Sequence, residues 1–349
     1  MYRRTGKVIG ILFGFFILVH LSVFSVLAQT KDKKEQYDIG PKIKLKLAHL
    51  VPTNQPVHHA AELFKKIVEE LTMSQVEITL YPANTFAPNV EAVEEVMRGT
   101  LDMQITTPGA AQTHIKPLAV CMLPFAFEDL RHAERHWHGP ALNKIQKIYE
   151  ENNIKVHNPG HWGFRQMSTR KTPIMHPEDL KGLKMRTPPE MQLQQMYRAF
   201  GAITTTIPLE EFALAMTQGV ADGQCSPIWV YDMSKFYENQ KYVAVTDHGY
   251  QVLFIYKNLK MWNKLPPNIQ RAIEYADEVA MDYTRALAYV TEKNILGSLP
   301  KKGITITRPN RAEFAAKMGP MHKAVAEYAG KKWFEEWTEL IKESGLRTF

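Results

Sequence analysis

Two stretches of 17 residues, which lie 120 positions apart in this chain, match each other at five equivalent places. Residues 88–104 and 208–224 share, at equivalent places, a proline, a glutamate, a glycine, an aspartate and a glutamine. Each copy predicts a helix that begins after the proline, ends at the glycine and leads into a strand with polar side chains at its end. If the match is not accidental, the chain folds into two α/β lobes of one design. Because open α/β sheets bind ligands at the carboxyl ends of their strands, two facing lobes predict a ligand cleft between them.

The order of strands and helices around the first copy supports this fold class. Residues 43–47 and 75–80 alternate between apolar and polar side chains, as half-buried strands do. Between them, residues 57–71 carry apolar side chains at helical spacing. Together with the helix and strand of the repeat, this gives a β-α-β-α-β order, which is typical of a mainly parallel sheet with helices on both faces.

Beyond Tyr250 we expect the chain to be mostly helical. Residues 266–295 have an amphipathic pattern that predicts one long helix, and residues 304–306 predict a short strand before a helical tail. No flexible or low-complexity linker separates the halves, so we expect several crossings of the chain between the lobes. We assign two segments to each lobe, residues 40–160 with 253–290 to lobe I and residues 161–252 with 291–340 to lobe II.

The first 28 residues have the pattern of a secretory signal peptide. Residues 1–7 hold three basic side chains and no acid, residues 8–28 are predominantly apolar, and small residues precede position 29. A retained membrane anchor is the alternative, because about 20 apolar residues can span a bilayer. We predict a signal peptide over residues 1–28 and a mature protein that is exported to the periplasm.

Composition and charge exclude several functions. The chain has 43 Lys and Arg against 36 Asp and Glu, a net charge of +7, and loss of residues 1–28 would leave +4. The basic residues are scattered among acidic ones, so we expect neither a nucleic-acid-binding surface nor a polybasic membrane patch. A small positive excess suits a small anionic ligand.

The sequence lacks the common motifs of catalysis and metal binding. No nucleophile elbow, Walker loop, H-E-x-x-H pair or EF-hand loop occurs. His132 and His136 lie one helical turn apart, but without a carboxylate ligand at helical spacing we expect a solvated helix face rather than a metal site. Cys121 and Cys225 could form a disulfide in the periplasm, and two buried thiols are the alternative. We therefore predict neither a metal nor a cofactor.

Two arginines are candidates for contact with an anionic ligand. Arg186 ends the strand-like residues 180–186 and precedes Thr187-Pro188-Pro189, and Arg165 follows the strand-like residues 155–157. An arginine at a strand end can point into a cleft, where its planar five-donor group suits a carboxylate. From these residues alone, a surface arginine in water is the simpler alternative.

Asp179–Pro188 has the sequence DLKGLKMRTP, and four further segments accompany it in order, namely Leu47–His49, Arg98–Met103, Leu123–Phe127 and Thr217–Gln224. Together they resemble the substrate-binding proteins of TRAP (tripartite ATP-independent periplasmic) transporters, and the resemblance extends over residues 42–337. It implies an α/β receptor with two lobes and a long helix along both. Such a receptor is not an enzyme. It closes on an organic acid in the periplasm and delivers it to a permease driven by an ion gradient.

The resemblance also implies roles for individual residues. Arg186 would bind the ligand carboxylate through two hydrogen bonds, and Arg165 matches a second arginine aimed at the same ligand. Ser226 replaces an asparagine that commonly contacts the ligand in members that bind sialic acid or other hydroxy acids, so the substrate class stays open. The further pocket candidates by position are Gln224, Asn54, Thr107, Trp162 and Trp229.

Two other functions fit the same fold. One is a periplasmic enzyme, such as a lyase or an isomerase, and the other is a ligand-sensing module that reports to a signalling receptor. The sequence offers no identifiable nucleophile, metal cage or acid–base pair near the two arginines, which argues against the enzyme. Trp162, Phe164 and Trp229 favour a ligand with an apolar portion. The expected partners are an organic acid anion and TRAP permease subunits, and no nucleic acid.

Overall fold

The computed structural model describes residues 40–346 of the chain. The description below concerns the compact unit that begins at Lys44, together with the few described residues before it. The signal peptide predicted for residues 1–28 lies outside the described residues. Among the helices within residues 40–346, none is both long and apolar enough to cross a membrane.

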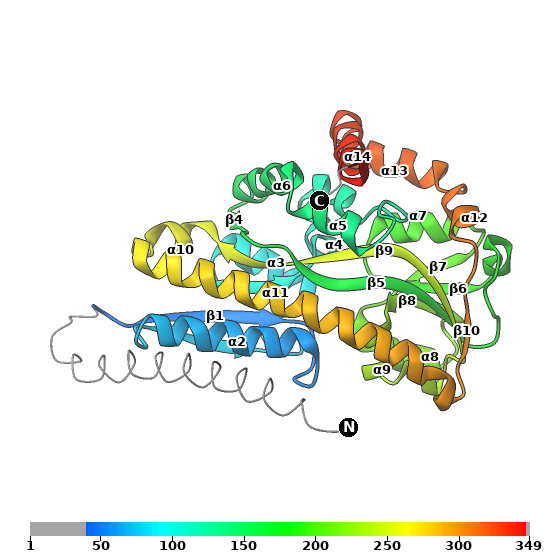
Figure 1. The fold of residues 1–349 in the computed structure, drawn as a ribbon, viewed down its shortest axis with the longest axis horizontal. Helices are drawn as coiled ribbons and strands as arrows, with labels where there is room; N and C mark the ends of the chain where they lie inside the picture. Colours follow the sequence, from blue (N-terminus) through cyan, green and yellow to red (C-terminus); the bar gives the residue numbers. More distant parts are fainter. Residues whose placement is uncertain (1–39, 347–349) are drawn as a thin grey trace, which may run out of the picture. The chain divides into compact units, whose positions relative to one another are not determined.

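One sheet lies at the centre of the fold, and within residues 40–346 it has ten strands (Figure 1). Its main path is β2-β1-β3-β9-β5-β8-β6-β7, and β4 and β10 both pair with β9. The strands are β1 (Ile43–His49), β2 (Val76–Tyr81), β3 (Met103–Thr106), β4 (Ile154–Lys155), β5 (Gly160–Thr169), β6 (Lys184–Thr187), β7 (Ile203–Thr206), β8 (Gly223–Pro227), β9 (Tyr242–Asn258) and β10 (Thr305–Thr307).

Helices cover both faces of this sheet. In Figure 1, α11 runs below the long strands β5 and β9, whereas α5, α7 and α13 lie above them. The α-helices are α2 (Pro56–Leu71), α3 (Asn89–Arg98), α4 (Pro108–Ala111), α5 (Leu130–Trp137), α6 (Pro140–Glu151), α7 (Met191–Ala199), α8 (Leu209–Thr217), α9 (Ile228–Met233), α10 (Leu259–Lys264), α11 (Pro267–Ser298), α12 (Arg311–Ala315), α13 (Gly319–Ala329) and α14 (Lys331–Leu346). Short 3₁₀ helices are η1 (Lys116–Met122), η2 (Pro177–Leu180), η3 (Phe236–Glu238) and η4 (Leu299–Lys302).

The repeated stretch forms the same structure twice. Pro88 precedes α3 with φ −53° and ψ 151°, and Pro208 precedes α8 with φ −53° and ψ 155°. Gly99 and Gly219 follow the two helices with φ values of 89° and 73°. Glycine adopts this left-handed conformation without the steric cost that other residues meet, and so it ends both helices.

The aspartates of the repeat hold both strands in the same way. Asp102 precedes β3, and its Oδ2 accepts a hydrogen bond of 2.8 Å from the backbone N–H of Lys46 in β1. Asp222 precedes β8, and its Oδ2 accepts one of 2.9 Å from the N–H of Lys184 in β6. The predicted repeat is therefore confirmed as a structural repeat.

The two copies belong to one continuous sheet. β3 pairs in parallel with β1 and antiparallel with β9, and β8 pairs in parallel with β6 and antiparallel with β5. β5 and β9 also pair antiparallel with each other and so join the copies. The two long strands thus add antiparallel pairs to the mainly parallel arrangement that the sequence predicts. The predicted lobe segments, 40–160 with 253–290 and 161–252 with 291–340, stay a prediction.

The prediction for the long helix agrees with the structure, but the prediction for the chain before it does not. α11 begins and ends close to the predicted range of 266–295, and it packs against α2, β5 and α9, so it runs along both copies as expected. The expectation of helical structure from Tyr250 was wrong, because β9 continues to Asn258. The residues of β9 from Gln251 onward are all buried, and a strand buried on both faces shows no alternation in its sequence.

The histidines of α5 do not form a solvated face. His132 and His136 are buried, and His132 Nε2 lies 2.8 Å from the carbonyl oxygen of Ile341 in α14. The ring of His136 lies 4.7 Å from that of Trp337 in the same helix. The solvated face was therefore a wrong prediction, since α14 covers these residues. Within residues 40–346 no group of three or more His, Cys, Asp or Glu could hold a metal ion.

Candidate functional site

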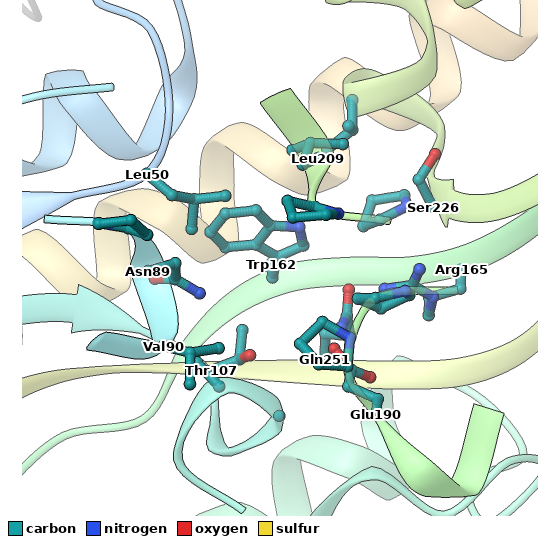
Figure 2. Close-up of a pocket in the computed structure, with 18 of the residues that line it drawn as sticks. Leu50, Asn89, Val90, Thr107, Trp162, Arg165, Glu190, Leu209, Ser226 and Gln251 are labelled. Carbon is teal, nitrogen blue, oxygen red and sulfur yellow. The ribbon is translucent and has the colours of Figure 1, made fainter. Parts of the chain in front are cut away.

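A cavity of about 320 Å³ lies where the two copies of the repeat meet (Figure 2). Its wall includes the start of α3, residues 88–91, and the start of α8 at Pro208 and Leu209. The carboxyl ends of the strands supply further lining residues, namely Leu50 after β1, Thr107 after β3, Pro188 after β6 and Pro227 of β8. The cavity therefore occupies the place that the repeat predicts for a ligand cleft.

Both candidate arginines line this cavity and are almost fully buried. Arg186 is 2% exposed and lies in β6, where its Nε donates a hydrogen bond of 2.7 Å to the carbonyl oxygen of Ile207. Its guanidinium carbon lies 5.2 Å from the centre of the Phe212 ring. The backbone carbonyl and the aromatic face hold the guanidinium in a fixed direction. A solvated surface position, the alternative from sequence, does not describe this residue.

Arg165 lies within β5 rather than after a strand, as the sequence had suggested. It is 5% exposed and opposes Pro227 of β8. Its Nε donates to Cys225 Sγ at 3.2 Å, and its Nη2 donates to the carbonyl oxygen of the same residue. The other terminal nitrogen, Nη1, carries two further N–H donors. Cys225 thereby positions Arg165, and both Cys225 and Cys121 are buried free thiols.

Ser226 and Gln224 lie two residues apart on the same face of β8, one in the cavity wall and one behind it. Ser226 lines the cavity, and its Oγ accepts a hydrogen bond of 2.8 Å from Gln224 Nε2. Gln224 is fully buried and does not line the cavity. It therefore contacts the cavity through Ser226. Thr107 lines the cavity from the loop that leads into α4.

Trp162 reaches the cavity because β5 has a bulge at this residue. His161 pairs with Val252 and Gly163 pairs with Gln251, so Trp162 has no partner in β9. A bulge of this kind turns one side chain away from the regular alternation of the strand. Trp162 lines the cavity, whereas Trp229 packs behind it with ring centres 5.2 Å apart. Trp229 Nε1 also donates to the carbonyl oxygen of Trp162 at 2.6 Å.

Asn54 is the one predicted site residue that the structure places outside this arrangement. It is exposed in the turn before α2 and does not line the cavity. Trp229 and Gln224 contact lining residues, and Arg165, Arg186, Ser226, Thr107 and Trp162 line the cavity directly.

The sequence analysis did not identify Glu190, which also lines the cavity. Its side chain is 6% exposed, and burial raises its pKa above the usual range, although the positive charges of Arg165 and Arg186 oppose part of this shift. One oxygen, Oε2, is buried without a hydrogen-bond partner among the described residues. The signal was an acid directly after the Pro188-Pro189 pair. Gln251 of β9 was missed as well, and its Oε1 is buried without a partner in the described chain.

Comparisons with known proteins agree with this architecture. The sequence profile of the family described as bacterial extracellular solute-binding protein, family 7, matches residues 47–328. The 2,3-diketo-L-gulonate-binding periplasmic protein of Escherichia coli K12 is 27% identical over 263 residues, which is 75% of this chain and 80% of that protein.

Two solved structures are similar over most of their length. A TRAP periplasmic solute-binding protein from Haemophilus influenzae with bound L-gulonate is 28% identical, with a TM-score of 0.81 over 86% of this chain and 99% of that one. A TRAP periplasmic solute-binding protein from Bordetella, whose ligand density is assigned to pantoate, is 25% identical, with a TM-score of 0.80 and the same coverage of 86% and 99%. These neighbours are binding proteins of transporters and not enzymes. The chain therefore belongs to the bacterial extracellular solute-binding proteins of family 7, the substrate-binding proteins of TRAP transporters.

Proposed function

We propose that this protein is a periplasmic receptor that binds an organic acid anion between Arg165 and Arg186 and delivers it to a TRAP permease in the membrane. The observation that carries the proposal is the pair of buried guanidiniums in one cavity, one from β5 and one from β6. The wall holds two buried guanidiniums and one buried carboxylate, that of Glu190, and this excess of buried positive charge favours an anionic ligand. A ligand carboxylate supplies the negative charge.

The binding energy can be estimated from these contacts. Each hydrogen bond between a guanidinium and a carboxylate contributes about 1.5–3 kcal/mol, and arginine can make two in parallel. Micromolar affinity needs about −8 kcal/mol, and association itself costs several kcal/mol. Apolar contacts must therefore add to the charged ones. Trp162, Leu50, Val90, Leu209 and Val230 line the cavity and offer that surface.

The family and the N-terminal pattern support the proposed place of action and the proposed partner. Relatives carry periplasmic location in their names, and residues 1–28 have the composition of a signal peptide. Binding proteins of this type change shape when two halves close on a ligand. The permease would then distinguish the closed form from the open one.

Calorimetric titration of residues 29–349 with a panel of monocarboxylates, dicarboxylates and sugar acids tests the proposal. We expect at least one acid to bind with micromolar or tighter affinity. Arg186→Ala should weaken that binding by at least about 100-fold, since it removes a pair of charge-assisted hydrogen bonds. Arg271→Ala, at an exposed position of α11, is the matched control and should leave the affinity unchanged.

Three results would count against the receptor. Binding that is equally strong in Arg186→Ala would remove this residue from the site. The lack of binding to any acid would overturn the carboxylate ligand. Conversion of a bound acid into another compound, detected by mass spectrometry, would favour the enzyme instead.

A further inference from the structure

We propose that Glu190 makes the cavity selective for a monocarboxylate that carries a hydroxyl near its carboxylate and an otherwise apolar chain. The inference rests on the proposed function and specifies which acid the two arginines accept. It begins with the position of Glu190, which follows Pro188 and Pro189 at the end of β6 and stands at the N-cap of α7. Its side chain accepts no capping hydrogen bond from the helix, and it lines the cavity instead.

The protein provides space for this carboxyl group. A Cβ atom at Gly109 of α4 would lie 2.6 Å from Glu190 Oε1 and 2.7 Å from its carboxyl carbon, which is closer than real Cβ contacts allow. Glycine at this position therefore lets the carboxyl group lie directly against α4. Figure 2 shows Glu190 and Arg165 bordering the same space, with Gln251 beside them.

Glu190 is the buried acid of the cavity wall. Of the two acidic residues that line it in the described chain, Glu91 is exposed to water, and Glu190 is buried. Glu190 lies within electrostatic reach of both Arg165 and Arg186, yet its Oε2 has no hydrogen-bond partner among the described residues. A buried carboxylate oxygen without a donor is costly, so a bound ligand that brings a donor to Oε2 gains affinity.

The charges of these three side chains select the ligand. Two guanidiniums and one carboxylate are matched by a ligand with a single negative charge. A second carboxylate on the ligand would lie beside Glu190 or against an apolar wall, and either contact is unfavourable. An ammonium group could satisfy Glu190, but it would lie near two guanidiniums. A hydroxyl supplies the missing donor without adding charge.

The rest of the wall determines the remainder of the ligand. Apart from the polar groups already named, the cavity is lined mainly by apolar side chains, including Leu50, Val90, Leu209, Val230 and Trp162. A chain that carries methyl groups gains from burial there, whereas a chain with a hydroxyl on every carbon would leave several of them without partners. A branched hydroxy acid fits these requirements better than a linear polyol acid.

Calorimetry with four matched probes tests the inference. The probes are 2-hydroxy-3-methylbutanoate, 3-methylbutanoate without the hydroxyl, valine with an ammonium in its place, and the dicarboxylate malate. We expect the wild-type protein to bind the hydroxy acid at least about tenfold more tightly than each of the other three. Pantoate, the ligand assigned in the Bordetella structure, is the larger positive probe, and gluconate is its polyol counterpart.

The variant Glu190→Gln keeps the shape of the side chain and removes its charge. We expect the preference for the hydroxy acid over malate to fall at least about tenfold in Glu190→Gln, because the repulsion of the second carboxylate is lost. Glu278→Gln changes an exposed acid of α11 that does not line the cavity, and it should leave the preference unaltered. Melting of the unliganded variants shows whether each is folded.

The outcomes separate this inference from the proposed function. If acids bind and Arg186→Ala abolishes their binding, but Glu190→Gln leaves the ratio of hydroxy acid to malate unchanged, the receptor stands and the role of Glu190 is wrong. A wild-type preference for malate, valine or the acid without a hydroxyl also overturns the inference alone. If the wild-type protein binds no acid at all, both fail.

Discussion

The buried ion pair between β9 and α11 offers the sharpest test of how this fold is held together. Lys257 Nζ donates a hydrogen bond to Asp277 Oδ2, and both side chains are fully buried. Burial lowers the pKa of Lys257 and raises the pKa of Asp277, and the attraction between them opposes both shifts. Each charge is therefore stabilised mainly by the other.

Asp277→Asn should destabilise the protein by about 3–5 kcal/mol, because it leaves the Lys257 ammonium buried without its counter-ion. The loss has an upper limit. The ammonium can release its proton, and at pH 7 this costs about 4–5 kcal/mol for a lysine with an ordinary pKa near 10.4. In the folded variant the lysine is then neutral, whereas in the unfolded chain it stays protonated up to its ordinary pKa.

This difference in protonation sets the sign of a pH effect. Between pH 7 and 10 the unfolded variant binds one proton more than the folded variant, so its stability rises with pH relative to the wild type. The slope is about 1.4 kcal/mol per pH unit, and about half of the initial loss should be recovered by pH 9.

Urea unfolding of both proteins at pH 7, 8 and 9, followed by circular dichroism, measures these quantities. The double variant Lys257→Met with Asp277→Leu is the control, and it should be within about 1 kcal/mol of the wild type or more stable. A loss below about 1 kcal/mol at pH 7 would refute the argument, as would a loss that does not shrink when the pH rises.

Two further predictions concern residues near the cavity. Burial and the negative charge of Asp247 raise the pKa of Glu292 to about 8, so the folded protein keeps a proton that the unfolded chain releases above its ordinary pKa. Stability should therefore fall by up to about 1.4 kcal/mol per pH unit between pH 5 and 7, and thermal melts of Glu292→Gln should lack this component, whereas an identical pH profile would contradict the shift. Trp229→Phe removes the hydrogen bond to the Trp162 carbonyl and should lower the free energy of unfolding by about 1–3 kcal/mol. Because Trp229 lies behind the cavity wall, ligand affinity should change less than threefold by calorimetry, and a larger loss would place it in the site.

The parts of the fold that follow regular patterns could be predicted from the sequence. The two copies of the repeat have the expected helix, glycine and strand, because proline and glycine restrict the backbone locally. β9 could not be predicted over its second half, since Gln251 to Lys257 are all buried and have no alternation. The bulge at Trp162 was also invisible, because it depends on how β5 and β9 pair at long range.

Among the residues around the cavity, too, some could be predicted from the sequence and others could not. Arg186 and Ser226 stand near strand ends, where topology places them at the cavity, and motif position alone was enough to select them. Asn54 is near a strand end as well, but its turn leaves it exposed. Glu190 resembles an ordinary acid at the start of a helix, and the sequence does not show that its side chain packs against Gly109 and lines the cavity.

The interruptions in the pairing of β5 with β9 have a mechanical consequence. The register shifts at Trp162 and again between Arg165 and Met167, where β9 passes through Asp247 with a φ of 43°. There Gln166 Oε1, instead of the ladder, accepts the N–H groups of Thr246 at 2.9 Å and of Asp247 at 3.0 Å. The ladder between β5 and β9 is thus interrupted at Trp162 and next to Arg165, two residues that line the cavity. We therefore expect a ligand bound against Trp162 and Arg165 to restrict motion where the pairing of β5 with β9 is interrupted.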